Sequence, residues 1–297
     1  MPEGDVVWRT AQRLSAALSG RELVVADLRW PSLATADLTG RTVIETVARG
    51  KHLLTRLAAA AGPTGSRGPS PAPAVTLHSH LRMEGSWRVD RTGFARRSRS
   101  PDVRAVLAND EWTATGISLG MLDLVATTDE ATLVGHLGPD VLGPDWDLDL
   151  VLANLRATPE RAIGAALLDQ RVLAGVGTFY LAETMFLVGR TPWTPIGDLT
   201  EAERGRVVER AYRLLHLNRD RVVQVTTGDA RPGHEAYAHG RSGRPCRRCG
   251  TTVRVARIGQ PPADRVAFYC PTCQIGPTPT DDGRPQGPIG STGGARG

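Results

Sequence analysis

Apolar side chains recur at helical spacing near the N-terminus. In residues 4–19 they share one helix face, and Gly20 follows as a stop signal. From residue 21 to residue 125 the pattern changes to short β-branched runs separated by turn residues, which predicts an antiparallel sandwich or barrel. The predicted strands are Leu23–Leu28, Thr42–Val47, His52–Leu57, Val75–Leu81, Trp87–Val89, Val103–Leu107, Glu111–Ala114 and Leu122–Val125.

A helical part follows the predicted strands. Residues 129–145 contain two Gly-Pro pairs and indicate a connector. Helical patterns then continue to about residue 227, and Thr200 with Glu203 forms a capping box before a long helix. The chain therefore combines a β-rich part with a helical part.

Three stretches lack the pattern of a folded element. Residues 58–74 are of low complexity and predict a surface loop, and residues 91–104 are arginine-rich and predict a hairpin loop. A solvated loop without a binding role is an equal interpretation of the second stretch. Residues 275–297 have too little apolar content to fold, so we expect them to be disordered.

Four cysteines near the C-terminus have the spacing of zinc ligands. Two Cys-x2-Cys pairs are separated by twenty residues, and each pair offers two thiolates to one side of a tetrahedron. A site closed by four cysteines leaves no open position, so we predict one structural zinc ion and no organic cofactor. Between the pairs, Val253–Ile258 and Arg265–Tyr269 are predicted to pair as strands. The predicted ligands are Cys246, Cys249, Cys270 and Cys273.

Composition and charge narrow the classes of function. The net charge of +5 and the pI near 9.4 favour an acidic partner such as nucleic acid. No apolar run approaches the roughly 20 residues of a membrane span, and the N-terminus has no signal-peptide pattern. We therefore expect no membrane association and a cytoplasmic, nucleoid-associated protein.

Lys51 is the only lysine among 36 basic residues. Arginine can replace lysine wherever only positive charge is needed, but a guanidinium stays protonated and cannot hand over a proton. Lys51 is thus a candidate for proton transfer, although composition alone leaves chance survival equally open.

The chain begins Met1-Pro2-Glu3. If Met1 is removed, Pro2 carries a secondary amine whose pKa near 7.7–8.0 leaves roughly one molecule in ten neutral at pH 7. A neutral amine of this kind attacks an aldehyde-like carbon and forms an iminium ion, while Glu3 can act as a proton donor. From Pro2-Glu3 alone, a proline that only begins the fold is the favoured interpretation.

Six motifs occur in an order that identifies a family. They are Pro2-Glu3-Gly4, Ala48-Arg49-Gly50-Lys51, His80-Leu81-Arg82-Met83-Glu84-Gly85, Gly138-Pro139-Asp140-Val141-Leu142, Leu168-Asp169-Gln170 through Gly175-Val176-Gly177, and the cysteine segment from Gly243 to Gln274. Together they resemble the formamidopyrimidine-DNA glycosylase and endonuclease VIII family across about residues 2–274, and Pro-Glu-Gly is more similar to the endonuclease VIII branch.

The resemblance implies an α+β fold of several domains. Its parts are an N-terminal β-sandwich with a leading helix (residues 1–128), a linker (129–145), a helix–two-turns–helix DNA-binding domain (146–232), a zinc hairpin (233–274) and a tail (275–297). The resemblance also implies a monomer that binds double-stranded DNA containing damaged bases or abasic sites in a cleft.

The implied activity is that of a bifunctional DNA glycosylase and abasic-site lyase in base excision repair, with oxidised pyrimidines preferred. Pro2 matches the Schiff-base nucleophile, and Glu3 matches the acid at the sugar. Lys51 matches the proton donor for base loss and β-elimination. Arg265 matches the arginine that grips phosphates and assists δ-elimination.

Further DNA contacts follow from the same resemblance. Arg82, Met83 and Glu84 match the side chains that fill the space of an extruded nucleotide, and an ordinary strand turn is an equal interpretation of them. Thr178 follows a glycine turn that opens a helix, where N–H groups suit a phosphate. His136 stands where endonuclease VIII has an arginine.

Three departures leave alternatives open. Thr178 replaces the usual asparagine, Val6 replaces a frequent glutamate, and His136 replaces the arginine. A DNA-binding protein that keeps the scaffold with little catalysis is one alternative. A glycosylase that prefers oxidised purines is the other.

Overall fold

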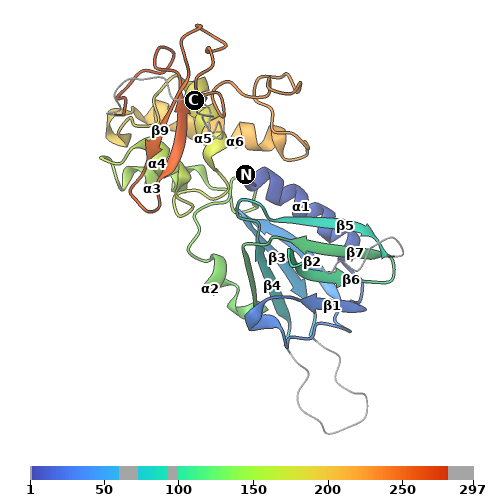
Figure 1. Cartoon of the computed structure of the whole chain (residues 1–297). Coiled ribbons are helices and arrows are strands. Elements are labelled where there is room, and N and C mark those ends of the chain that lie inside the picture. The colour runs from blue at the N-terminus through green and yellow to red at the C-terminus, as the bar shows by residue number, and fades with distance from the viewer. Residues whose placement is uncertain (1, 60–72, 93–99, 280–297) are drawn as a thin grey trace, which may run out of the picture. The chain divides into compact units, whose positions relative to one another are not determined.

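The computed structural model describes residues 2–59, 73–92 and 100–279, and the chain divides into two compact units, residues 1–137 and 138–297 (Figure 1). Most of the predicted low-complexity loop, the middle of the arginine-rich loop and nearly all of the predicted tail lie outside the described residues.

A leading helix and two four-stranded sheets form the first unit. Helix α1 spans Gly4–Leu18, and every strand pairs antiparallel with its neighbours. One sheet has the order β1-β6-β7-β5 and the other β2-β3-β4-β8. The bounds are β1 Val25–Leu28, β2 Val43–Arg49, β3 His52–Leu57, β4 Val75–His80, β5 Ser86–Arg91, β6 Val103–Ala108, β7 Trp112–Ile117 and β8 Met121–Ala126. All eight predicted strands are confirmed, with ends moved by a few residues.

One apolar core holds the helix and both sheets together. Leu14 and Leu18 of α1, Leu53 and Leu77 of one sheet, and Leu107 of the other are at most 1% exposed and belong to the same cluster. Burying each such side chain stabilises the fold by about 1.5–3 kcal/mol relative to leaving it in water. Along each strand, successive side chains alternate between the face that enters this core and the opposite face.

The opposite face of the β2-β3-β4-β8 sheet carries a group of polar side chains. Because Leu53 and Leu77 enter the core, their strand neighbours point the other way. On this face the Arg56 guanidinium donates to both carboxylate oxygens of Glu130 at 2.7 Å, and the Thr76 hydroxyl donates to the same carboxylate at 2.5 Å. These bonds tie a short 3-10 turn (η3, Thr127–Asp129) and helix α2 (Ala131–Val134) to the sheet.

Helices and a C-terminal hairpin form the second unit. The helices are α3 Leu148–Arg156, α4 Ile163–Leu168, α5 Thr178–Val188 and α6 Glu201–Asn218. Thr200 and Glu203 form the predicted capping box of α6. Strands β9 (Arg254–Ile258) and β10 (Arg265–Tyr269) pair antiparallel, close to the prediction.

The prediction that helical structure continues to about residue 227 is wrong. Helix α6 ends at Asn218. The Asn218 side chain is fully buried, accepts a bond from the backbone N–H of Val225 at 2.7 Å and donates to the Val225 carbonyl at 3.0 Å. These bonds hold the chain after the helix in a turn.

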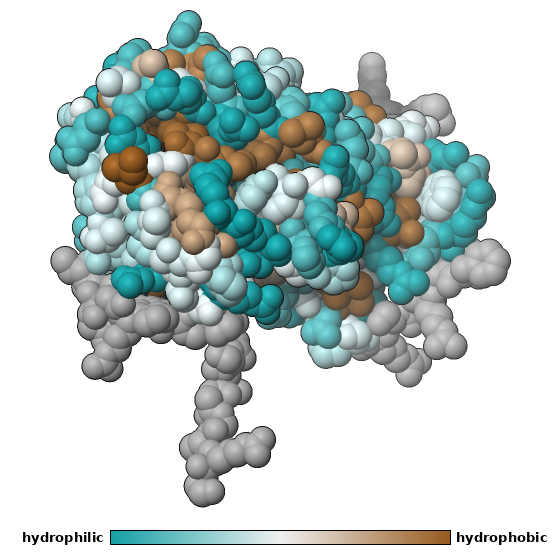
Figure 2. Space-filling view, turned by 90° about the horizontal axis from the view of Figure 1, so that it is seen from above, coloured by the Kyte–Doolittle hydropathy of each residue, from teal (hydrophilic) through white to brown (hydrophobic). Residues whose placement is uncertain are grey.

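In the part of the chain that the structure describes, no helix is long and apolar enough to cross a bilayer. Figure 2 shows hydrophobic residues on the visible face in separate groups among hydrophilic ones.

Candidate functional site

Pro2 and Glu3 stand at the entrance to helix α1. Glu3 has extended backbone angles and is fully buried, and its carbonyl accepts the backbone N–H of Val7 at 3.0 Å. Pro2 is half-buried. The first helical turn therefore fixes the backbone that carries the predicted nucleophile and the predicted acid.

Lys51 lies on a two-residue turn between strands β2 and β3. Arg49 and His52 are the last paired residues of the two strands, so Gly50 and Lys51 alone make the connection. Gly50 has a φ of 57°, a left-handed conformation that glycine adopts without strain. The short turn fixes the position of the Lys51 backbone relative to the sheet.

Histidines gather beside this turn on the polar face of the sheet. Nδ1 of His52 lies 2.8 Å from Nε2 of His78, and Nδ1 of His78 lies 2.9 Å from Oδ2 of Asp123 on β8. The His52 ring stacks on that of His78 with centroids 5.0 Å apart and meets the edge of His80 at 4.9 Å. His136, the residue that replaces the expected arginine, has its ring 6.4 Å from that of His52.

The environment of these histidines disfavours their charged form. Burial, followed by the neighbouring histidines and Arg82, lowers the pKa of His52 to about 3. Burial, followed by Arg82, His78 and Lys51, lowers the pKa of His80 to about 4. Both imidazoles are thus uncharged at neutral pH, and both lie near cationic side chains.

Residues 82–84 form the exposed tip of the turn between β4 and β5. All three are exposed, and Met83 has 66% of its surface accessible. Arg82 has a φ of 53°, unusual for a residue other than glycine, and its backbone N–H donates to Nδ1 of His80 at 2.9 Å. The tip therefore presents an apolar, unbranched side chain in a backbone conformation braced by a histidine of the cluster.

Thr178 begins helix α5 after the glycine turn that the sequence singled out. The Gln170 side chain braces that turn, since it accepts the Gly175 N–H at 3.0 Å and donates to the Val176 carbonyl at 3.0 Å. Thr178 itself is 6% exposed. The structure thus places Thr178 at a helix N-terminus with little of its side chain accessible.

A buried carboxylate in α5 was missed by the sequence reasoning. Glu183 is fully buried, and its oxygens accept the backbone N–H groups of Tyr237, Ala238 and His239 at 2.8–2.9 Å. The Thr226 hydroxyl donates to the same carboxylate. Glu183 therefore anchors the segment that leads into the cysteine hairpin.

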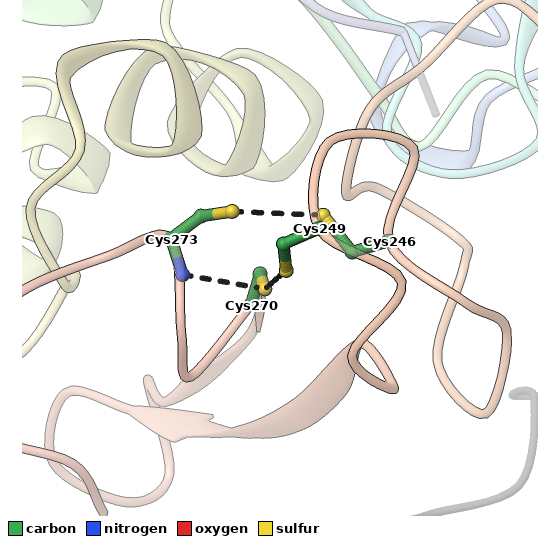
Figure 3. A group of neighbouring side chains, drawn as sticks. All are labelled: Cys246, Cys249, Cys270 and Cys273. Carbon is green, nitrogen blue, oxygen red and sulfur yellow. Dashed lines mark hydrogen bonds between the residues drawn. The ribbon is translucent and has the colours of Figure 1, made fainter.

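The four cysteine sulfur atoms converge on one point (Figure 3). Sγ of Cys246 lies 3.8 Å from Sγ of Cys273, and Sγ of Cys249 lies 3.5 Å from Sγ of Cys270. Zinc–sulfur bonds of 2.3 Å in a tetrahedron require sulfur atoms about 3.8 Å apart. All four sulfurs lie within 4.8 Å of one another, and the described cysteines form no disulfide. The cluster can bind a metal ion, and its geometry fits zinc.

Arg265 is the first residue of β10 and is exposed. Its guanidinium Nη1 donates to the carbonyls of Ala263 and Asp264 at 3.0 and 2.9 Å. Arg257 of the facing strand pairs instead with the Asp264 carboxylate at 2.9 Å. Arg257 and Arg265 thus differ in charge compensation, because of the two only Arg257 pairs with a carboxylate in these contacts.

The predicted site residues fall in both units. Pro2, Glu3, Lys51, Arg82, Met83, Glu84 and His136 belong to the first unit, and Thr178, Arg265 and the cysteines belong to the second. The structure brings Lys51, His80 and Arg82 into one electrostatic neighbourhood. It adds His52, His78, Asp123 and Glu183, none of which the sequence reasoning selected.

Family models match both units. The formamidopyrimidine-DNA glycosylase N-terminal domain matches residues 1–119, and the H2TH domain of the same glycosylases matches residues 137–222.

Curated relatives match over nearly the whole length. A probable endonuclease 8 2 of Streptomyces coelicolor is 49% identical over 96% of this chain and 98% of its own. The DNA-(apurinic or apyrimidinic site) lyase Nei2 of Mycolicibacterium smegmatis is 44% identical over 92% of this chain and 99% of its own.

Solved structures share the fold. MutM in complex with DNA containing carbocyclic 8-oxo-G superimposes with a TM-score of 0.72 at 22% identity, over 93% of this chain and 100% of that chain. Lactococcus lactis Fpg with abasic-site DNA gives 0.71 at 21% identity, over 93% and 100% of the two chains.

Proposed function

Since the chain belongs to the formamidopyrimidine-DNA glycosylase and endonuclease VIII family, we propose that it is a DNA glycosylase and abasic-site lyase of base excision repair. The relatives named endonuclease 8 2 and DNA-(apurinic or apyrimidinic site) lyase support this class. The single observation that carries the proposal is the arrangement of Pro2 and Glu3 at the start of α1, in a chain whose one lysine lies on a fixed turn.

The proposed reaction begins at Pro2 once Met1 has been removed. The proline nitrogen attacks C1′ of the damaged nucleotide, the bond between C1′ and the base breaks, and the base leaves with the bonding electron pair. After the nitrogen loses its proton, its lone pair forms the C1′=N bond while the C1′–O4′ bond breaks and O4′ takes up a proton. The ring-opened iminium ion then withdraws electrons from C2′. Removal of a C2′ proton then expels the 3′ phosphate in β-elimination.

Proton movements belong to Glu3 and Lys51 in this proposal. Glu3 donates to the sugar oxygen as the ring opens, and its burial keeps that carboxyl group away from bulk water. Lys51 donates a proton to the leaving base and then assists β-elimination. A primary amine gains and loses a proton where a guanidinium cannot, which accounts for lysine at this position in an arginine-rich chain.

The remaining predicted residues are assigned to DNA. Met83 at the exposed tip, with Arg82 and Glu84, fills the space left when the nucleotide is extruded, a step that costs a few kcal/mol of unstacking. Arg265 grips phosphates and promotes δ-elimination. Thr178 and His136 contact the sugar-phosphate backbone of the DNA. Thr178 has little exposed side-chain surface, so its contact is small.

We assign the four-cysteine cluster to one zinc ion. Zinc held by four thiolates has no open position, so its role is to stabilise the hairpin that carries Arg265. The proposed enzyme is a monomer with the domain boundaries predicted from the sequence. Its proposed partner is double-stranded DNA that contains damaged bases or abasic sites.

Borohydride trapping tests the mechanism. Duplexes that contain an oxidised pyrimidine, an oxidised purine or an abasic site are incubated with enzyme shown by mass spectrometry to lack Met1. We expect a covalent complex in which peptide mapping places the DNA on Pro2. Binding without trapping or strand cleavage on any of these duplexes indicates instead a DNA-binding protein that keeps the scaffold. The ranking of cleavage rates decides between pyrimidine and purine preference.

A further inference from the structure

The histidine cluster contains a hydrogen-bonded chain that crosses three strands. It runs from Asp123 on β8 through His78 on β4 to His52 on β3, with distances of 2.9 and 2.8 Å. His78 is 1% exposed, whereas His52 is half-buried. The chain therefore leads from a carboxylate at one side of the sheet, through a buried ring, to the first residue after Lys51.

The order of donors and acceptors fixes the tautomer of His52. A carboxylate oxygen accepts hydrogen bonds, so the contact with Oδ2 of Asp123 assigns the hydrogen to Nδ1 of His78. A His78 ring with hydrogen on Nδ1 alone accepts at Nε2, and in this arrangement Nδ1 of His52 donates to it. A neutral His52 with hydrogen on Nδ1 leaves Nε2, on the side of the ring away from His78, as an uncharged hydrogen-bond acceptor.

The groups that face His52 keep it in this uncharged state. In the strand register, Arg49 of β2 and His80 of β4 lie opposite His52. Arg82 and His136 approach from the turn after β4 and from the segment after α2. Burial is the largest cause, and His80, His78, His136 and Arg82 act in the same direction, so the pKa of His52 is lowered to about 3.

We propose that His52, held by His78 and Asp123, is a positioning residue that sets the geometry of the Lys51 turn. This inference rests on the proposed function, in which Lys51 transfers a proton. His52 forms one stem of the two-residue turn, and the bond from its ring to His78 fixes that stem against β4 and β8. Proton transfer depends on sub-ångström placement of the donor, so a loosened stem slows the chemical step.

Its test uses two substitutions of one residue. His78→Phe keeps a ring to stack on His52 but removes the acceptor, and His78→Gln restores an acceptor without the ring. Single-turnover assays use the full-length enzyme and the lesion duplex that the wild type cleaves fastest. In these assays we expect His78→Phe to slow base release about tenfold. The Kd for DNA should stay within twofold, and His78→Gln should recover most of the rate.

Thr76→Val is the matched control. Thr76 lies on the same strand and the same face as His78 but bonds to Glu130. Its loss should lower the melting temperature without slowing base release, which separates a general weakening of the sheet from a loss of positioning. An equal rate loss in Thr76→Val would overturn the inference.

The Lys51→Arg background shows whether His78 acts through Lys51. If it does, His78→Phe causes no further slowing there, because the residue that it positions is already gone. A further tenfold loss contradicts the inference. If the wild-type enzyme neither traps nor cleaves DNA, the proposed function is refuted. If the wild type is active but His78→Phe and Lys51→Arg slow base release independently of each other, only this inference is refuted.

Histidine 15N NMR supplies a readout that does not depend on activity. Wild-type His52 should show hydrogen on Nδ1 and stay uncharged down to about pH 4, and His78→Phe should remove that tautomer preference. If Nε2 of wild-type His52 carries the hydrogen instead, the proposed hydrogen bond from His52 to His78 is contradicted directly.

Discussion

Oε1 of Glu183 lies 2.8 Å from the backbone nitrogen of Ala238, 55 residues further along the chain. The same carboxylate accepts the N–H groups of Tyr237 and His239 and the hydroxyl of Thr226. A single buried side chain of α5 thus satisfies the backbone of the segment that precedes the first cysteine pair. This relationship makes the hairpin depend on the helical part of the second unit.

Glu183→Gln should destabilise the second unit by about 2–4 kcal/mol, because the amide NH2 would face backbone donors and bonds to a charged acceptor would be lost. Urea unfolding monitored by tryptophan fluorescence measures the change. Glu209→Gln, at an exposed position of α6, is the control and should cost less than about 0.5 kcal/mol. A similar stability for the two variants would show that the buried carboxylate is dispensable.

Lys51→Arg should slow base release at least tenfold while the Kd for lesion DNA changes less than about threefold. The charge remains, but the guanidinium cannot give up a proton at working pH. Single-turnover rates and fluorescence anisotropy measure the two quantities separately. Unchanged base release would remove Lys51 from proton transfer. Arg49→Lys combined with Lys51→Arg tests whether another lysine on the same hairpin restores the rate.

Arg265→Ala should weaken DNA binding and reduce the salt dependence of log K by about 0.9, the value for one phosphate contact. The measurement is a titration of lesion duplex at several salt concentrations. Arg257→Ala is a matched control from the facing strand, since Arg257 is already paired with Asp264. An unchanged slope in Arg265→Ala would place this arginine away from the phosphates.

Zinc removal should unfold the hairpin and abolish DNA binding, because the binding energy of a structural metal is also folding energy. Elemental analysis of the purified protein should give one zinc per chain. Cys249→Ala should lower zinc occupancy and weaken DNA binding together. Full DNA affinity in metal-free protein would show that the cysteine cluster is not required for binding.

The strands could be predicted because each sheet buries one face. His52–Leu57 was predicted to the residue, because this short run contains three leucines and follows the turn residue Gly50. The end of α6 could not be predicted in the same way. It depends on bonds between Asn218 and Val225, and nothing in the helical pattern signals a side chain that captures the backbone seven residues later.

The candidate site was only partly accessible to sequence reasoning. Pro2, Glu3, Lys51 and the cysteines stand in short motifs, so their residue types and spacing were sufficient. The Asp123–His78–His52 chain is distributed over three strands, and its members meet only through the register of β3, β4 and β8. The available signal was two histidines, His78 and His80, separated by one residue on a strand that follows Lys51-His52. Side chains two residues apart on a strand point to the same face.

The two ends of strand β3 differ in how they tolerate a change in chain length. At its start, the turn consists of Gly50 and Lys51 alone, so an inserted residue would move the lysine relative to the sheet. At its end, Leu57 pairs directly with Val75, so the strands keep their register whatever length of chain joins them. The connection between Leu57 and Val75 is therefore the place to insert a fluorophore site or an affinity tag while leaving the lysine turn in place.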